Sequence, residues 1–118
     1  MKYAMLIYPK PDTPADLDEA AAEALTAEYM ALRDDERCVG GGHLQPGETA
    51  TTVRGGSSGV MTSDGPFADA KEVLGGYYIL DASDMDEALE FAERIPAVRF
   101  GGAVEIRPLV EIPVETGH

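Results

Sequence analysis

The chain has 118 residues, the length of one domain, and its 44% hydrophobic and 26% charged residues are typical of a folded protein rather than a disordered one. Nine basic against 22 acidic residues give a net charge of −13, which argues against binding to nucleic acid or to an anionic membrane surface. The single cysteine excludes an internal disulfide and a cysteine-based zinc site.

Residues 2–8 are predicted to form a first strand, and apolar side chains on both of its faces indicate a central place in a sheet. This run is too short for a signal peptide or a membrane span, so we expect a cytoplasmic protein. A helix is expected over residues 14–36, because Thr13 can cap it and Pro14 suits its first turn. Its apolar residues lie near one stripe: Leu17, Ala21, Leu25, Tyr29 and Leu32.

The middle of the chain is rich in glycine and is expected to form strands. Residues 38–44 are one strand, in which three consecutive glycines indicate a bulge or a close approach by other atoms. Residues 49–54 and 59–62 are predicted to pair as a hairpin across Gly55-Gly56-Ser57. Asp64-Gly65-Pro66-Phe67 is then expected to be a loop.

The last third of the chain is predicted to contain a strand, a helix and a final strand. Residues 73–81 are apolar on both faces and are the strongest strand of the sequence. Ser83-Asp84-Met85-Asp86 resembles a capping box, with Asp in place of Glu, and starts a helix over residues 85–95 that Pro96 ends. The residues assigned to its apolar stripe are Met85, Leu89 and Ala92, with Ala88 and Ile95 adjoining it. Residues 104–107 alternate as a final strand.

The predicted element order is β-α-β-β-β-β-α-β. Without the hairpin this is the split β-α-β arrangement of a ferredoxin-like α+β fold, whose two helices cover one face of an antiparallel sheet. Two strands are nevertheless apolar on both faces, so the uncovered face must be buried against something. We therefore expect a homodimer with two-fold symmetry, packed sheet against sheet.

Asp64-Gly65-Pro66-Phe67 is followed by Lys71-Glu72 and Gly75-Gly76-Tyr77-Tyr78, and this set resembles the YCII-related superfamily, in the branch named for its Asp-Gly-Pro-Phe (DGPF) motif. The resemblance covers nearly the whole chain, which we treat as a single domain over residues 1–118. It extends to Met1-Lys2-Tyr3, Leu44-Gln45-Pro46, Thr51-Thr52-Val53-Arg54, Asp86-Glu87-Ala88-Leu89, Ile95-Pro96 and Glu105-Ile106-Arg107-Pro108.

The resemblance implies a ferredoxin-like fold assembled as a dimer, similar in architecture to the muconolactone-isomerase-like dimeric α/β barrels. Wider members of the superfamily have been proposed to be enzymes that use a His–Asp pair in a cavity, so an acid–base enzyme of the lyase or isomerase kind is one expectation. Members of the DGPF branch are often encoded beside extracytoplasmic-function sigma factors. A non-catalytic regulatory or interaction module that acts with such a sigma factor is therefore the alternative.

His43 and Asp64 are the candidate catalytic residues. His43 follows three glycines that leave room around its ring, and an imidazole can act as a general acid or base near neutral pH. Pro66 has no N–H, so the Asp64 carboxylate lacks the usual bond to the residue two positions on. The structural alternatives are a histidine with one hydrogen bond and an aspartate that caps its loop.

Four further residues are candidates for contact with a small polar or aromatic ligand. Arg54 and Lys71 are among the few positive charges and could hold an anionic group, although each could instead pair with a neighbouring glutamate. Phe67 and Tyr78 could line a cavity, although packing in the core or at a dimer interface is the more usual role of an aromatic side chain. The sequence contains no spacing typical of a metal site, and no cofactor is expected.

Overall fold

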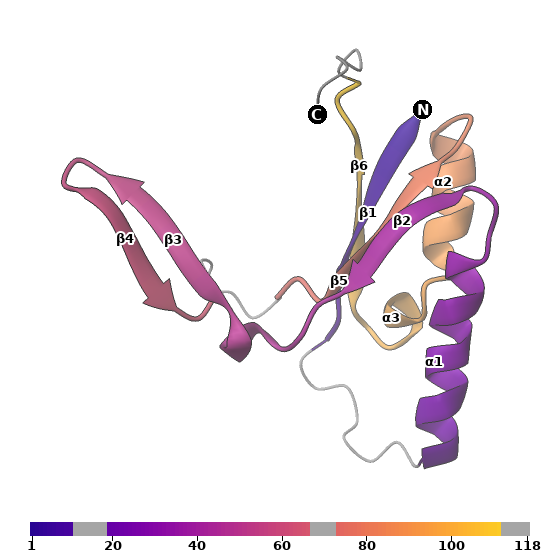
Figure 1. Cartoon of the computed structure of the whole chain (residues 1–118). Helices are drawn as coiled ribbons and strands as arrows, with labels where there is room; N and C mark the ends of the chain where they lie inside the picture. Colours follow the sequence, from indigo (N-terminus) through magenta and orange to yellow (C-terminus); the bar gives the residue numbers. More distant parts are fainter. Residues whose placement is uncertain (11–18, 67–72, 112–118) are drawn as a thin grey trace.

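The computed structural model describes residues 1–10, 19–66 and 73–111, which form a four-stranded sheet, a separate two-stranded hairpin and helices (Figure 1). The four strands are antiparallel, in the order β2-β5-β1-β6. This order and the chain connections are compatible with the predicted ferredoxin-like arrangement. The strands span Lys2–Tyr8 (β1), Cys38–His43 (β2), Gly76–Asp81 (β5) and Ala103–Pro108 (β6).

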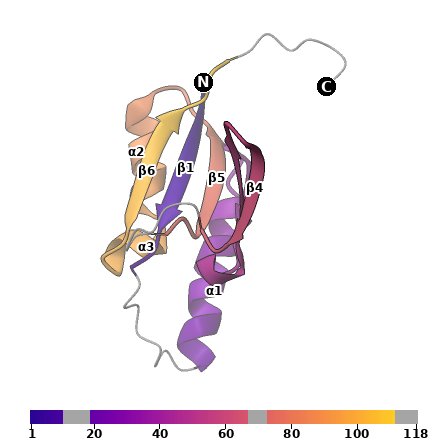
Figure 2. The ribbon, with the colours of Figure 1, turned by 90° about the vertical axis from the view of Figure 1, so that its left-hand side faces the viewer.

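The α-helices of the described ranges lie on one side of the four-stranded sheet, as Figure 2 shows. Alternate residues of the two central strands point towards these helices, so the core forms between the layers. The rings of Tyr78 and Phe91 meet edge to face, with centroids 5.6 Å apart. The largest contributors to this core are Tyr3, Met5, Ile7, Leu32, Tyr78, Leu80, Phe91 and Ile95.

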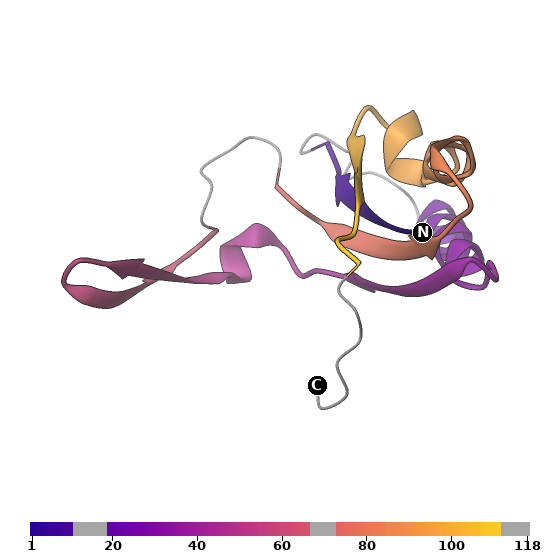
Figure 3. The same ribbon diagram turned by 90° about the horizontal axis from the view of Figure 1, so that it is seen from above.

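The other face of the sheet has no helix over it in the described part of the chain (Figure 3). Because the core residues alternate along each strand, the intervening side chains occupy this second face. They include Ala4, Leu6, Tyr8 and Ile79, which we call the open sheet face, and Ala4 pairs in register with Ile79. The predicted apolar character of both faces is thus confirmed for β1, the strand that contributes three of these four residues.

The described part of the first helix, α1, spans Glu19–Arg33. It ends earlier than the predicted boundary at residue 36, because the Asp35 carboxylate accepts a hydrogen bond from the backbone N–H of Arg37 at 2.9 Å. Such a local turn competes with continuation of the helix. Only Leu32 is fully buried among the residues of α1.

The second helix, α2 (Met85–Glu93), begins one residue later than the predicted capping box implies. Asp84, not Ser83, is the cap, and its carboxylate accepts a hydrogen bond from the Glu87 N–H at 3.0 Å. The Glu87 carboxylate in turn accepts from the Ser83 N–H at 3.3 Å. The predicted stripe was right in part: Ala92 and the adjoining Ala88 and Ile95 are buried, whereas Met85 and Leu89 are exposed and the buried Phe91 was not assigned to it.

Two further boundaries differ from the prediction. Pro96 was predicted to end the preceding helix, and in the structure it is also the first residue of a short helix, α3 (Pro96–Arg99). The strand expected from residue 73 starts at Gly76. Just before it, Gly75 lies close to Pro9: a Cβ on Gly75 would be 2.8 Å from the Pro9 ring. Pro9 has no N–H for the ladder, so pairing of β1 with β5 ends at Ile7 and Gly76.

The hairpin is confirmed and extends away from the helices and the sheet (Figure 3). It consists of β3 (Thr51–Gly56) and β4 (Gly59–Asp64), and it follows a 3₁₀ turn, η1 (Gly47–Thr49). Asp64, expected in a loop, is the last residue of β4 and pairs with Thr51. Apart from Thr52, the side chains of the hairpin are exposed, including Val53 at 65% and Val60 at 73%.

Candidate functional site

A cavity of about 350 Å³ lies between α1 and the ends of three strands, and we call it the α1 cavity. The α1 residues in its wall are spaced three or four apart and so share one face of the helix. Most of the lining is apolar or aromatic. It comprises Ile7, Pro9, Lys10, Leu25, Thr26, Tyr29, Met30, Arg33, Gly42, His43, Gly76, Tyr77, Tyr78, Ala97 and Phe100.

The cavity exists because α1 is attached to the sheet mainly near its C-terminal end. Leu32 is buried in the core, and the Tyr78 hydroxyl donates a hydrogen bond to the Tyr29 carbonyl at 3.0 Å. Facing α1, the strand β2 carries three glycines, so His43 at its end is the only large side chain that this strand contributes to the described lining. A Cβ on Gly41 would lie 2.7 Å from the Tyr77 carbonyl oxygen and 3.1 Å from the Tyr78 ring, so this position requires glycine.

Of the two candidate catalytic residues, His43 lies in the wall of the α1 cavity. It is the last residue of β2, it pairs in register with Gly76, and its side chain is exposed. Asp64 belongs to the other sheet, is exposed, and is not among the residues that line this cavity. The α1 cavity therefore brings His43 together with Tyr77 and Tyr78, but not with Asp64.

The candidate ligand-binding residues are distributed over different parts of the chain. Tyr78 lines the α1 cavity and is also part of the core. Arg54 is exposed on the hairpin, in register with Met61, and lies outside this cavity. Phe67 and Lys71 lie outside the described residues.

Two tyrosines of the cavity wall are held in the neutral form. Burial raises the pKa of Tyr78 to about 12, and the nearby Tyr29 hydroxyl adds to this rise. Burial also raises the pKa of Tyr29. Near neutral pH both phenols are therefore protonated, and neither can serve as a base without a large cost in free energy. His43 is the histidine of the wall, and imidazole is the side-chain group most often used for general acid–base catalysis.

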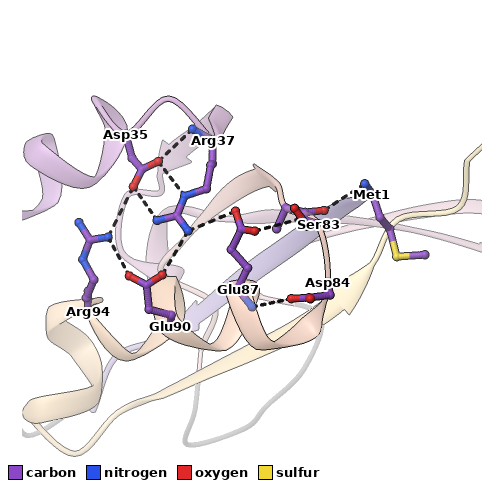
Figure 4. A network of polar contacts seen from close by, with 9 residues as sticks. Met1, Asp35, Arg37, Ser83, Asp84, Glu87, Glu90 and Arg94 are labelled. Atoms are coloured by element: carbon purple, nitrogen blue, oxygen red, sulfur yellow. Dashed lines mark hydrogen bonds and ion pairs between the residues drawn. The ribbon is translucent and has the colours of Figure 1, made fainter.

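The end of α1 is fixed by a network of charged side chains (Figure 4). Asp35 receives two hydrogen bonds from the Arg37 guanidinium, at 3.0 and 2.8 Å, in addition to the one from its backbone. Arg37 also contacts Glu87 and Glu90 of α2, at 3.4 and 3.3 Å. Hydrogen bonds from Arg37 hold the pKa of the Asp35 carboxyl well below its usual range. The network thus joins the turn after α1 to the helix α2.

Cys38 has no activated thiol. Burial raises its pKa, and the thiol donates a hydrogen bond to the Gly40 carbonyl at 3.4 Å. This agrees with its interpretation as a small, partly buried residue. Within the described ranges, no group of three or more His, Cys, Asp or Glu side chains is arranged to hold a metal ion.

Sequence reasoning missed several residues of the cavity wall. Leu25 and Tyr29 were assigned to a core stripe, but both are only partly buried and face the cavity. Arg33 and Phe100 were not singled out at all. The available signal was the glycine-rich strand β2 opposite α1, because a strand with few large side chains leaves unfilled space between a helix and a sheet.

The molecule is an α+β protein with helices on one face of an antiparallel sheet and a cavity under the first helix. The chain belongs to the YCII-related domain family, whose model matches residues 1–113. It is also 32% identical over 114 residues to an uncharacterised protein of Rhizobium meliloti (strain 1021), with 92% of each chain covered. No helix in the described ranges has the length and apolar character needed to cross a membrane.

Proposed function

We propose that this YCII-related protein binds a small polar or aromatic molecule in the α1 cavity, where His43 acts as general acid or base. The observation that carries the proposal is a largely apolar cavity of about 350 Å³ with this imidazole in its wall. Small-molecule sites are typically concave, lined by apolar and aromatic groups, and about 300–1,000 Å³ in volume with a few polar groups. The α1 cavity has each of these properties.

The chemistry of the wall assigns different roles to its polar side chains. Tyr78 and Tyr29 are neutral, so they can bind a ligand but not accept its proton. His43 carries the imidazole of the wall and is the acid–base group of the proposal. The partnership of His43 with Asp64 stays a prediction, because Asp64 does not line this cavity.

Binding can be tested without knowing the natural ligand. Isotope-labelled protein is screened by NMR against a library of small aromatic and polar fragments, and we expect hits that shift the backbone amides of Gly42, His43 and Gly76. Leu25→Trp places an indole in the cavity and should abolish those shifts, because Leu25 lines its wall. Ala22→Trp is the matched control, since Ala22 is exposed on the same helix and outside the cavity wall.

Two outcomes would overturn the proposal that the ligand binds in the α1 cavity. Hits that shift only amides of the hairpin or of the open sheet face would place binding elsewhere. Shifts that survive Leu25→Trp unchanged would show the same. A thermal unfolding curve of each variant confirms that it is folded before the comparison is made.

We also propose that two copies pair through their open sheet faces, in the manner of a dimeric α/β barrel with ferredoxin-like subunits of the DGPF branch. Supporting this, Leu6, Tyr8 and Ile79 are only partly buried in the single chain, on a face that no described helix covers. Covering that face removes apolar surface from water, at about 25 cal/mol per Å². A cytoplasmic location remains part of this proposal.

Ile79→Glu tests the pairing, because a charge buried between two sheets without a partner is costly. Multi-angle light scattering should give a dimer for the native chain and a monomer for this variant. Leu89→Glu is the control, since Leu89 is exposed on α2, on the helical side. A native monomer at micromolar concentration, or a variant that stays dimeric, would contradict the pairing.

The second candidate function is a non-catalytic interaction module, with an extracytoplasmic-function sigma factor as the expected partner. The exposed hairpin favours it, because Val53, Val60 and Met61 are each more than 60% exposed. An isolated two-stranded hairpin is only marginally stable in water, so a partner would stabilise it. Pull-down from native lysate should recover the sigma factor, and Val60→Lys should reduce that recovery; recovery that is unaffected would exclude the hairpin as the contact.

A further inference from the structure

The charges around the α1 cavity are opposite to those of the chain as a whole. The protein has 22 acidic and nine basic residues, yet the lining of the cavity contains Arg33 and Lys10 and no Asp or Glu among the described residues. In a chain of net charge −13, a cavity wall without carboxylates is a specific feature rather than an average property of the surface.

Arg33 lies on the same helical face as the apolar wall. Leu25, Tyr29 and Arg33 are spaced four residues apart, which places them one above another along α1. Arg33 is exposed and also belongs to the lining of the cavity, so its guanidinium lies beside the apolar wall while remaining accessible to solvent. No carboxylate of the described ranges forms an ion pair with Arg33.

From this arrangement we infer that the ligand of the α1 cavity is a small amphipathic oxyanion, an apolar or aromatic body bearing one carboxylate or phosphate, with Arg33 as its anion-binding residue. The inference rests on the proposed function and names its ligand class. A guanidinium presents two parallel N–H donors that match the two oxygens of a carboxylate or phosphate. Tyr29, Met30 and Phe100 supply the apolar surface for the remainder of such a molecule.

The volume limits the size of that molecule. About 350 Å³ is at the lower end of the range for small-molecule sites, which suits one ring with a short side chain and excludes a nucleotide or a long acyl chain. The Arg33 guanidinium is exposed, so an anionic group that it binds gains a charged hydrogen bond that water and salt partly screen. An uncharged analogue of the same shape would leave the guanidinium without its partner.

The test measures Kd by NMR for 3-phenylpropionate, 2-phenylethyl phosphate and the neutral 3-phenylpropionamide with the full chain. We expect one of the two anions to bind about tenfold more tightly than the amide, or better, which is the usual effect of one hydrogen-bonded charge. The anion that binds best identifies the head group. Arg33→Gln should remove this preference, while Lys2→Gln, which neutralises a charge outside the cavity wall, should retain it.

The results distinguish the oxyanion class of the ligand from small-molecule binding in the cavity as such. Equal binding of the amide and both anions in the cavity would overturn the oxyanion inference and leave small-molecule binding intact. An anion preference that survives Arg33→Gln would overturn the role of Arg33. Binding of every probe outside the cavity, by amide shifts, would overturn both this inference and the proposed function. The side chain of Arg33 is exposed, so unfolding of the variant is not expected, and its thermal unfolding checks this.

Discussion

Asp35→Asn removes the charge at the centre of the network that fixes the end of α1. In the native chain this carboxylate accepts three hydrogen bonds from Arg37, at 2.9, 3.0 and 2.8 Å, and a longer one from Arg94 at 3.5 Å. The side chains of Asp35 and Arg37 are only 15% and 23% exposed. Their ion pair is therefore less screened by water than a fully solvated pair on the surface. The amide of the variant keeps the shape and loses the charge.

The expected loss in free energy of unfolding is about 2 kcal/mol, since hydrogen bonds to charged groups contribute about 1.5–3 kcal/mol. For a domain of this size this lowers Tm by about 8 °C. Urea denaturation at pH 7 measures the difference directly. Glu90→Gln is the control, because Glu90 is 59% exposed and makes one contact of 3.3 Å with Arg37, so its loss should be under about 1 kcal/mol.

The pH dependence gives the same prediction a second test. The folded-state pKa of Asp35 is lowered, so its contribution to stability is complete above the unfolded value of about 3.9 and is lost as pH falls towards the folded value. The stability difference between the native chain and Asp35→Asn should therefore be constant from pH 5 to 8 and should shrink below about pH 4. Equal stability of the two proteins at pH 7, or a difference that grows in acid, would refute this reasoning.

Three further predictions concern the core and the cavity. Phe91→Ala should lower the free energy of unfolding by about 3–5 kcal/mol in urea denaturation, because Phe91 is fully buried; a loss under 1 kcal/mol would contradict this packing. Gly41→Ala should lower stability and distort β2, because its Cβ would lie 2.7 Å from a carbonyl oxygen, and an unchanged Tm would show that the strand adjusts freely. His43→Ala should weaken binding of the NMR fragment hits while Asp64→Ala does not, since only His43 lines the cavity; equal losses would indicate that the two act as a pair.

The alternation of apolar residues was sufficient to predict the sheet and the helix order. In β1, Tyr3, Met5 and Ile7 alternate with Ala4 and Leu6 exactly as a strand between two covered faces requires, and every predicted element is present in its expected order. The hairpin was predicted for a similar reason, because β-branched residues flank a glycine-rich turn. Local pattern therefore determines much of this architecture.

Other features depend on contacts between distant segments, which local pattern does not contain. Phe91 was missed because the predicted stripe included Met85 and Leu89 instead, whereas the side of α2 that carries Phe91 packs against the ring of Tyr78. The strand β5 begins later than predicted, at the point where Gly75 lies close to the ring of Pro9. Element boundaries shift where such a contact, or a cap like Asp84, overrides the local pattern.

The candidate site was predictable only in part. His43 was identified from its glycine-rich surroundings, and the structure places it in a cavity wall. Arg33 and Phe100 come from segments that are far apart in sequence, and nothing local indicates that they face one space. Leu25 and Tyr29 have the spacing of a core stripe, and only the loose packing of α1 on the sheet makes them cavity residues instead.

The most direct test of small-molecule binding under α1 is a crystal structure of the protein soaked with 3-phenylpropionate. We expect electron density for the ring between Tyr29, Met30 and Phe100, with the carboxylate at the Arg33 guanidinium. Density for the probe on the open sheet face or the hairpin, with the space beside Leu25 filled only by ordered water, would contradict the account.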